Sequence, residues 1–409
     1  MTGRPKSERD MPSYLDVFRS PGYAPIFLMS ALSVWGDYIA RLTVAAVVYE
    51  RTRSPLATAG TLAVSLLPTI FGRSLLGPLA DRFPYKHVLI ASHLLRALLV
   101  LALIAAVAAQ VQLGYLLLTM FVLEALGGPA TSSTLVLMTD LFQDRRRYTK
   151  AFGLNTLADQ FNQAVGFALG GVLVAALGPI RSLVVDLFTF LLSAAVLRVA
   201  VRLRPVVGVP AKGLVGFFSD ISTGARYIVR HPVLARLLAL SLVATLAISA
   251  PEALAIPYAG NAGEGGLLMA SPILGAVLGL VLVGRWQPGV ANARIILMAL
   301  LMPLPLLGTV MRPPLVVTAL LWFASGVLQA FMLPLQSTFS LLIPAERRGT
   351  VFGLAGAASV SAAGVAYLVA GWLSQHVPPE SAVTICAVVA FGGLVLTAAG
   401  WPRKRLREA

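Results

Sequence analysis

Acidic and basic side chains stand inside long apolar stretches of this sequence, where an unpaired charge is expensive. Asp37 and Arg41 lie four residues apart in the apolar stretch from Tyr23 to Tyr49, which places them on one face of a helix. An ionised side chain near the middle of a bilayer costs roughly 2.5 to 3.5 kcal/mol, so each one needs a partner or a water-filled cavity. We expect Asp37 and Arg41 to neutralise each other, either as a static pair that fixes helix packing or as a proton-coupling site in which protonation of Asp37 frees Arg41.

Glu124 is the second candidate for proton coupling. It lies about 15 Å along the apolar stretch from Gly114 to Thr139, close to the midplane of a bilayer. The run Gly127-Gly128-Pro129 follows it and predicts a loosened helix at that depth. Glu124 therefore joins Asp37 and Arg41 in the predicted proton-coupling site.

A stripe of polar residues marks a later apolar stretch. Asn155, Asp159, Asn162 or Gln163, and Gly166 recur at helical spacing, which predicts either a cavity-facing surface or a polar seam between helices. Arg96 lies a few turns from the end of its own stretch, where it either snorkels to the interface, pairs with Asp81 or Asp159, or holds a substrate anion. The residues that we expect to line a substrate cavity are Asn155, Asp159, Gln163, Arg96 and, as uncharged positions late in the chain, Gln329 and Gln336.

Four other ionisable side chains receive more ordinary interpretations. Asp186 and Glu252 lie nearer the outer ends of their apolar stretches, where we expect positions at the rim of the membrane. His93 and His376 stand alone in the sequence, which favours ordinary polar positions on helices over a proton relay.

Composition sets the class of protein. The 409 residues are 57% hydrophobic and 12% charged, with a mean hydropathy of +0.83, which indicates an integral membrane protein. Of the 32 Lys and Arg, about 24 fall in loops on one side of the expected spans, so the net charge of +15 reflects a positive-inside orientation and not a nucleic-acid-binding face. Cys386 is the only cysteine, so no intrachain disulfide forms, and no Gly-x-x-x-x-Gly-Lys-Ser/Thr loop supports ATP hydrolysis.

The apolar stretches predict twelve membrane spans in two groups of six. We expect the spans near 23–49, 55–79, 88–109, 114–139, 151–177, 180–201, 232–258, 265–286, 291–310, 313–338, 350–376 and 381–401. The chain then divides into a cytoplasmic segment (1–22), a first half (23–201), a cytoplasmic linker with an amphipathic helix around 217–228 (202–231), a second half (232–401) and a basic cytoplasmic tail (402–409).

The two halves repeat one another. Phe152-Gly153-Leu154 recurs as Phe352-Gly353-Leu354, and Gly171 recurs as Gly371, all at an offset of 200 residues. Spans five and eleven are therefore equivalent, and because equivalent spans are six apart, both halves cross the membrane in the same direction.

A charged loop follows the second expected span. Gly77 removes a side chain one turn before Asp81, and Arg82 and Lys86 follow, an order that predicts a latch between helices. This pattern resembles the loop signature of the major facilitator superfamily, and the internal repeat is similar to that superfamily over essentially the whole chain. The resemblance implies an all-α membrane protein with the major facilitator fold, twelve transmembrane helices in two six-helix halves, and a gating role for Gly77, Asp81, Arg82 and Lys86.

A closer resemblance lies within the superfamily. Trp35-Gly36-Asp37 with Arg41, the run from Leu94 to Leu99, and the span-five glycines (Gly166, Gly170 and Gly171) resemble the drug:proton antiporter branch that holds macrolide and enterobactin exporters. The resemblance implies a secondary active transporter that couples protons to efflux of amphipathic or lipophilic small molecules by alternating access.

Two alternatives stay open. An acid on the first span is also similar to ferroportin-like metal exporters, although Arg41 stands beside Asp37 where a neutral ligand would be wanted. A membrane scaffold that has lost transport is the other, although it has no evident use for buried charges. For the leading hypothesis we expect a small-molecule substrate, protons and the lipid bilayer as partners. We also expect no nucleic acid, no cofactor, no enzymatic activity, and a monomer in the cell (inner) membrane with both termini cytoplasmic.

Overall fold

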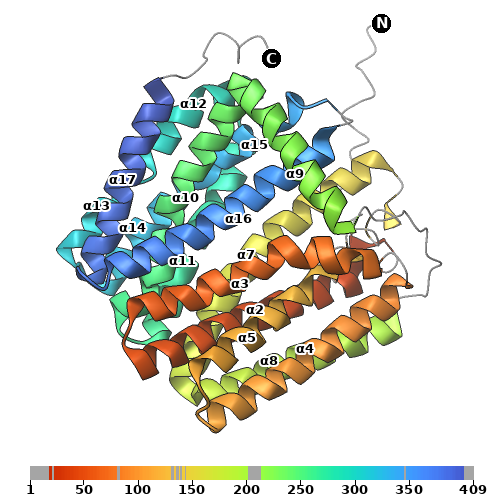
Figure 1. Ribbon diagram of the computed structural model, residues 1–409. Helices are drawn as coiled ribbons and strands as arrows, with labels where there is room; N and C mark the ends of the chain where they lie inside the picture. Colours follow the sequence, from red (N-terminus) through yellow and green to blue (C-terminus); the bar gives the residue numbers. More distant parts are fainter. Residues whose placement is uncertain are drawn as a thin grey trace, which may run out of the picture.

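Long helices lie side by side in two groups in the computed structural model (Figure 1). The structure describes residues 18–20, 23–80, 83–129, 133–134, 138, 141–142, 144–200, 213–344 and 347–399. Within that part of the chain every regular element is a helix. The all-α class predicted from the apolar stretches is therefore confirmed.

The first group of helices comes from residues before the linker. It consists of α2 (Tyr23–Thr52), α3 (Pro55–Ala80), α4 (Tyr85–Ala108), α5 (Leu113–Ala125), α7 (Arg145–Leu177) and α8 (Pro179–Ala200).

The second group begins after a helix within the predicted linker, α9 (Gly213–Arg230). It consists of α10 (Pro232–Ala259), α11 (Ala262–Val283), α12 (Pro288–Leu301), α13 (Leu304–Leu307), η1 (Gly308–Met311), α14 (Leu315–Leu328), η2 (Gln329–Phe331), α15 (Met332–Leu341), α16 (Arg348–Leu373) and α17 (Pro379–Ala399). Helix α9 packs on the start of α16, where Gly224 faces Thr350 and Leu354.

Ten described helices are long and apolar enough to cross a bilayer. Two shorter apolar helices, Pro55–Pro68 and Leu113–Pro129, stand where we expect the second and fourth spans, and the count of twelve spans stays a prediction. Large apolar side chains cover outer faces of both groups: Leu98, Phe188 and Leu320 are 61%, 63% and 61% exposed. Such faces are stable against lipid and not against water, so the chain is a multi-pass membrane protein.

The two groups meet most closely at one end of the bundle. We call this the distal end, where α2 ends and α3 begins, and we call the opposite end, which holds α9, the linker end. At the distal end a Cβ on Gly171 of α7 would lie 2.8 Å from the carbonyl oxygen of Ala262 on α11, and a Cβ on Gly371 of α16 would lie 2.7 Å from the Cβ of Ala59 on α3. Only glycine permits such close approach of two helix backbones.

These two contacts occupy equivalent positions in the internal repeat. Helix α7 meets α11 through Gly171, while α16 meets α3 through Gly371, which stands 200 residues later in the chain. Because α3 and α11 are themselves equivalent in the repeat, the halves touch through two matching glycine contacts. A hydrogen bond from the Gln375 amide to the Ser54 hydroxyl, 3.3 Å long, lies at the same end.

Candidate functional site

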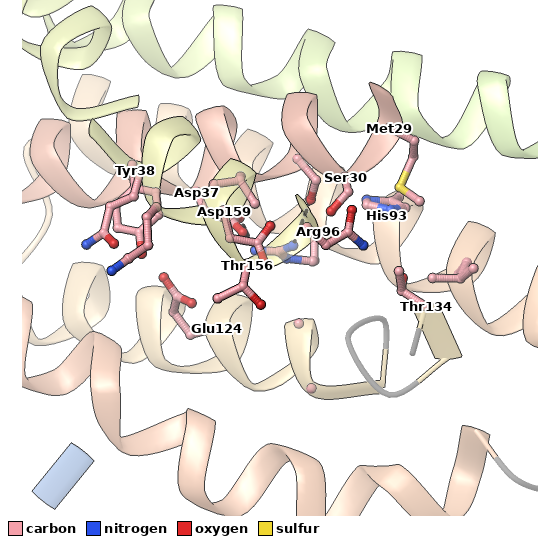
Figure 2. A pocket seen from close by; sticks show the side chains of 18 of the residues that line it. Met29, Ser30, Asp37, Tyr38, His93, Arg96, Glu124, Thr134, Thr156 and Asp159 are labelled. Carbon is pink, nitrogen blue, oxygen red and sulfur yellow. Dashed lines mark hydrogen bonds and ion pairs between the residues drawn. The ribbon is translucent and has the colours of Figure 1, made fainter. Parts of the chain in front are cut away.

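A cavity of about 610 Å³ opens in the first half of the molecule, and every described residue that lines it lies between Met29 and Gln163 (Figure 2). Its wall is formed by α2, α4, α5, α7 and residues that follow α5. The lining includes seven of the predicted proton-coupling and cavity residues, which come from all four of these helices: Asp37, Arg41, Arg96, Glu124, Asn155, Asp159 and Gln163.

Arg41 of α2 forms a bidentate ion pair with Glu124 of α5. Its Nε donates to Oε1 at 2.5 Å and its Nη2 donates to Oε2 at 2.7 Å. The fork geometry of guanidinium and carboxylate makes this the strong form of a side-chain ion pair. Only 14% of the Arg41 side chain and 5% of the Glu124 side chain are exposed, so each charge depends on the other. The expected pairing of Arg41 with Asp37 is therefore wrong.

Asp37 pairs instead with Arg96 of α4. An Nη2 proton of Arg96 is donated to Oδ1 of Asp37, and Nη1 lies 3.5 Å from the hydroxyl of Ser33. The Arg96 side chain is 3% exposed and the Asp37 side chain is 20% exposed. Asp37 is therefore the more accessible partner of the pair from the cavity. Of the two partners expected for Arg96, Asp159 is not its hydrogen-bonded acid, and Asp81 lies outside the described residues.

The predicted loosening of the helix after Glu124 is confirmed. Helix α5 ends at Ala125, one residue after Glu124, and the carbonyl that this exposes at Leu126 accepts a 2.6 Å hydrogen bond from the hydroxyl of Ser92. Gly127 then lies against Arg96, whose Cζ would be 3.8 Å from a Cβ at that position. A backbone break at membrane depth is tolerated because a neighbouring side chain satisfies the freed carbonyl.

The polar stripe of α7 divides between the cavity and a helix seam. Asn155, Asp159 and Gln163 line the cavity, and Asp159 is exposed to it. Asn162 turns toward α2 and accepts a 2.9 Å hydrogen bond from the indole Nε1 of Trp35. Both alternatives for the stripe are therefore realised, by residues one position apart on the helix.

Other predicted residues lie elsewhere. Gln329 begins η2 and Gln336 lies on α15, and neither lines the cavity. Gly77 lies within α3, whereas Asp81 and Arg82 lie outside the described residues. Lys86 donates from Nζ to the carbonyl oxygen of Arg198 at 2.7 Å, which ties the start of α4 to the end of α8.

Asp186 of α8 is the residue that sequence reasoning placed wrongly. It is fully buried, whereas we expected a position at the rim of the membrane. A Cβ on Gly36 would overlap Oδ1 of Asp186 and Oγ1 of Thr189, so this acid lies directly against the backbone next to Asp37. The signal in the sequence was the glycine that precedes Asp37, which marks close approach of another helix.

Three other titratable residues lie outside the two ion pairs. His93 is 1% exposed and neither of its ring nitrogens has a partner among the described residues. Glu252 of α10 is hydrogen-bonded by the hydroxyl of Tyr367 on α16. His376 is exposed in the turn that follows α16, with Nδ1 3.0 Å from the carbonyl oxygen of Trp372, so it does not lie on a helix as expected.

Comparison with known proteins relates this architecture to transporters. The family model described as Major Facilitator Superfamily matches residues 26–304. An uncharacterized MFS-type transporter of Bacillus subtilis (strain 168), YfmI, is 26% identical over 181 residues, which is 42% of this chain and 44% of that protein. The match thus spans less than half of the relative's length.

Solved structures share the fold across nearly the whole chain. A bacterial homologue of the human lysosomal transporter Spinster, in an inward-facing and unoccupied conformation, has a TM-score of 0.64 at 15% identity and covers 92% of this chain and 96% of its own. A mutant of the nucleoside transporter NupG has a TM-score of 0.71 at 13% identity, with 92% and 98% covered. A mutant of the peptide transporter POT in complex with alafosfalin has a TM-score of 0.68 at 16% identity, with 97% of each chain covered.

Proposed function

Because the chain belongs to the Major Facilitator Superfamily and is a multi-pass membrane transporter of a small molecule, we propose that it exports amphipathic or lipophilic compounds in exchange for protons. Membrane transport follows from the family. The outward direction, the coupling to protons and the chemical class of the substrate are what we add.

The observation that supports proton coupling is the pair of ion pairs in the cavity wall. Asp37 with Arg96 and Glu124 with Arg41 are held by side chains that are between 3% and 20% exposed. Removing one partner of such a buried pair leaves an uncompensated charge, which costs about 3 to 5 kcal/mol. Protonating Asp37 or Glu124 has the same consequence for its arginine, so a single proton changes the free energy of the whole site.

Alternating access supplies the second half of the mechanism. The halves are in contact at the distal end through Gly171 and Gly371, while the cavity extends along α2 from Arg41 back to Met29, toward the linker end. We place the linker end and both termini in the cytoplasm, on the strength of the positive-inside distribution of Lys and Arg. In that orientation the cavity faces inward, which is the conformation named for the Spinster homologue.

The cavity suits an organic substrate. A volume of about 610 Å³ lies within the range of sites that hold drug-sized ligands. Its wall combines carboxylates at Asp37 and Asp159 with the apolar side chains of Met29, Leu89 and Phe152. Because the cavity and both ion pairs are complete within one chain, we propose a monomer as the transporting unit.

Metal export receives no comparable support. The described residues contain no group of three or more His, Cys, Asp and Glu side chains that could hold a metal ion. Asp37, the acid that suggested a metal ligand, is engaged by Arg96.

The test is proton movement in proteoliposomes that hold the purified full chain under an imposed pH gradient. We expect lipophilic cations and macrolides to stimulate proton flux in the parent protein, and Asp37→Asn to abolish that stimulation. Glu264→Gln is the matched control, because it also replaces a carboxylate by an amide but lies exposed at the start of α11, outside the cavity. Flux that follows divalent metals, or an absence of flux with every compound in the parent, contradicts the proposal.

A further inference from the structure

Asp186 on α8 is a buried acid that the two ion pairs leave without a base. It is 0% exposed, and its Oδ1 lies 3.3 Å from the hydroxyl of Thr189, which stands one turn later on the same helix. Its Oδ2 has no hydrogen-bond partner among the described residues. Buried carboxyl oxygens are almost always hydrogen-bonded, so an oxygen left open here needs an explanation.

A hydrogen-bond donor of Arg96 also lacks a partner among the described residues. Its Nε is buried and has no acceptor among the described residues, although Nη2 is bound to Asp37. The guanidinium lies over the ring of Phe190 at 4.4 Å from the centroid, one turn beyond Asp186 on α8. The same arginine therefore rests on the helix that carries the unpartnered acid while it pairs with the acid of α2.

The charges of this region do not balance when every acid is ionised. Asp37 from α2, Glu124 from α5 and Asp186 from α8 are three acids that interact electrostatically with one another, and Arg96 and Arg41 are the two bases beside Asp37. Glu252 of α10 also lies within electrostatic reach of Arg41, but it is hydrogen-bonded by Tyr367. A net charge buried at this depth costs several kcal/mol, so the group holds one proton. His93 of α4 also faces this region, but neither of its ring nitrogens contacts an acid.

We propose that Asp186 holds this proton and that Arg96 exchanges partners between Asp37 and Asp186. When Asp186 is protonated, Arg96 pairs with Asp37, which is the arrangement in the structure. When Asp186 loses its proton, Arg96 turns to Asp186 and leaves the carboxylate of Asp37 free at the cavity wall. A cationic substrate then binds Asp37, so one proton leaves as one positive charge enters and the charge of the region is unchanged.

This role rests on the proposed exchange of substrate for protons and assigns its substrate class, which is lipophilic monovalent cations. Asp37 is suited to bind the substrate, because 20% of its side chain is exposed and it lines the cavity. Asp186 is suited to hold the proton, because it is fully buried behind Gly36. Proton and substrate thus compete without sharing a carboxylate.

The test is binding of tetraphenylphosphonium to the purified full chain in detergent, measured together with proton release. In the parent we expect the affinity to rise up to about tenfold per pH unit near neutrality, with one proton released per cation bound. Asp186→Asn keeps Arg96 on Asp37, so we expect weak binding at every pH and no proton release. Adding Arg96→Gln to Asp186→Asn frees Asp37, so the double variant regains both binding and proton release.

The double variant distinguishes partner exchange from a merely structural role of Asp186. If Asp186→Asn only damaged the packing of α8, a second substitution at Arg96 would not restore binding. Ser193→Ala is the matched control: it removes a buried hydroxyl from α8 without touching an acid, and it should titrate like the parent. A monodisperse peak in size-exclusion chromatography checks folding of each variant.

Three results overturn the proposal. Parent-like pH dependence in Asp186→Asn excludes Asp186 as the proton carrier, and binding that the double variant fails to regain excludes the exchange of Arg96. A parent that binds no cation and releases no proton overturns the proposed function itself, and this outcome is visible before any variant is made.

Discussion

The distal contact between the halves predicts how a single methyl group shifts the conformational equilibrium. A Cβ on Gly171 would lie 2.8 Å and 2.9 Å from the carbonyl oxygens of Ala262 and Gly263, and 3.0 Å from the Cα of Gly266. All three atoms belong to the backbone of α11, so they cannot move aside without moving the helix. Gly171→Ala therefore opposes closure of the distal end by about 1 to 3 kcal/mol, the usual cost of overpacking.

The size of the effect follows from this energy. A change of about 2 kcal/mol alters a ratio of two states about 30-fold, so a distally open population of about 1% becomes about a quarter of the molecules. Alanine also has a higher helix propensity than glycine, but that gain is the same in both conformations and cancels. Gly153→Ala is the matched control on the same helix, because no atom lies within 4 Å of its added Cβ.

Distances between two spin labels at the distal end measure this population. Gln112 after α4 and His376 after α16 are exposed positions on different halves, and Cys386→Ser removes the only native cysteine. We expect a long-distance population to grow in Gly171→Ala and to stay at the parent level in Gly153→Ala. An unchanged distribution in Gly171→Ala would refute the reasoning that close backbone approach holds the distal end shut.

Two further predictions concern pairs of residues in the first half. Arg41→Gln and Glu124→Gln should each lower the free energy of unfolding by about 3 to 5 kcal/mol, because each leaves one buried charge without a partner. The double variant removes both charges and should lose less than the sum of the two single losses. Denaturant titration in detergent measures all three variants, and additive losses would contradict the pairing. Trp35→Phe removes the 2.9 Å hydrogen bond to Asn162 and should cost about 1 kcal/mol in the same assay, whereas no loss would mean that the bond between α2 and α7 contributes nothing.

Much of the fold was predictable because a lipid bilayer permits few backbone structures. Apolar stretches of about 20 residues must be helices, since no water satisfies the backbone there. The same rule made the break after Glu124 visible, because Gly127 and its neighbours weaken a helix wherever they stand. Gly171 and Gly371 were visible in the sequence as a repeat, but the close helix contacts that they permit appear only in the structure.

The partners of the charged residues were not predictable in the same way. Four residues separate Asp37 and Arg41, which is enough to place them on one face but not to decide what that face meets. The partners that the fold supplies, Arg96 and Glu124, stand 59 and 83 residues away. Neither separation leaves a local pattern, because the pairing depends on which helices lie at the same depth.

Asp186 illustrates the same limit for burial. Its distance along α8 could be counted from the sequence, but its exposure depends on how closely α2 approaches, which Gly36 allows. The sequence by itself determined which segments are helices, where they break and which charges they carry into the membrane. Tertiary structure alone decided that three acids and two arginines share one buried region, because charges from separate helices interact only after packing has brought those helices together.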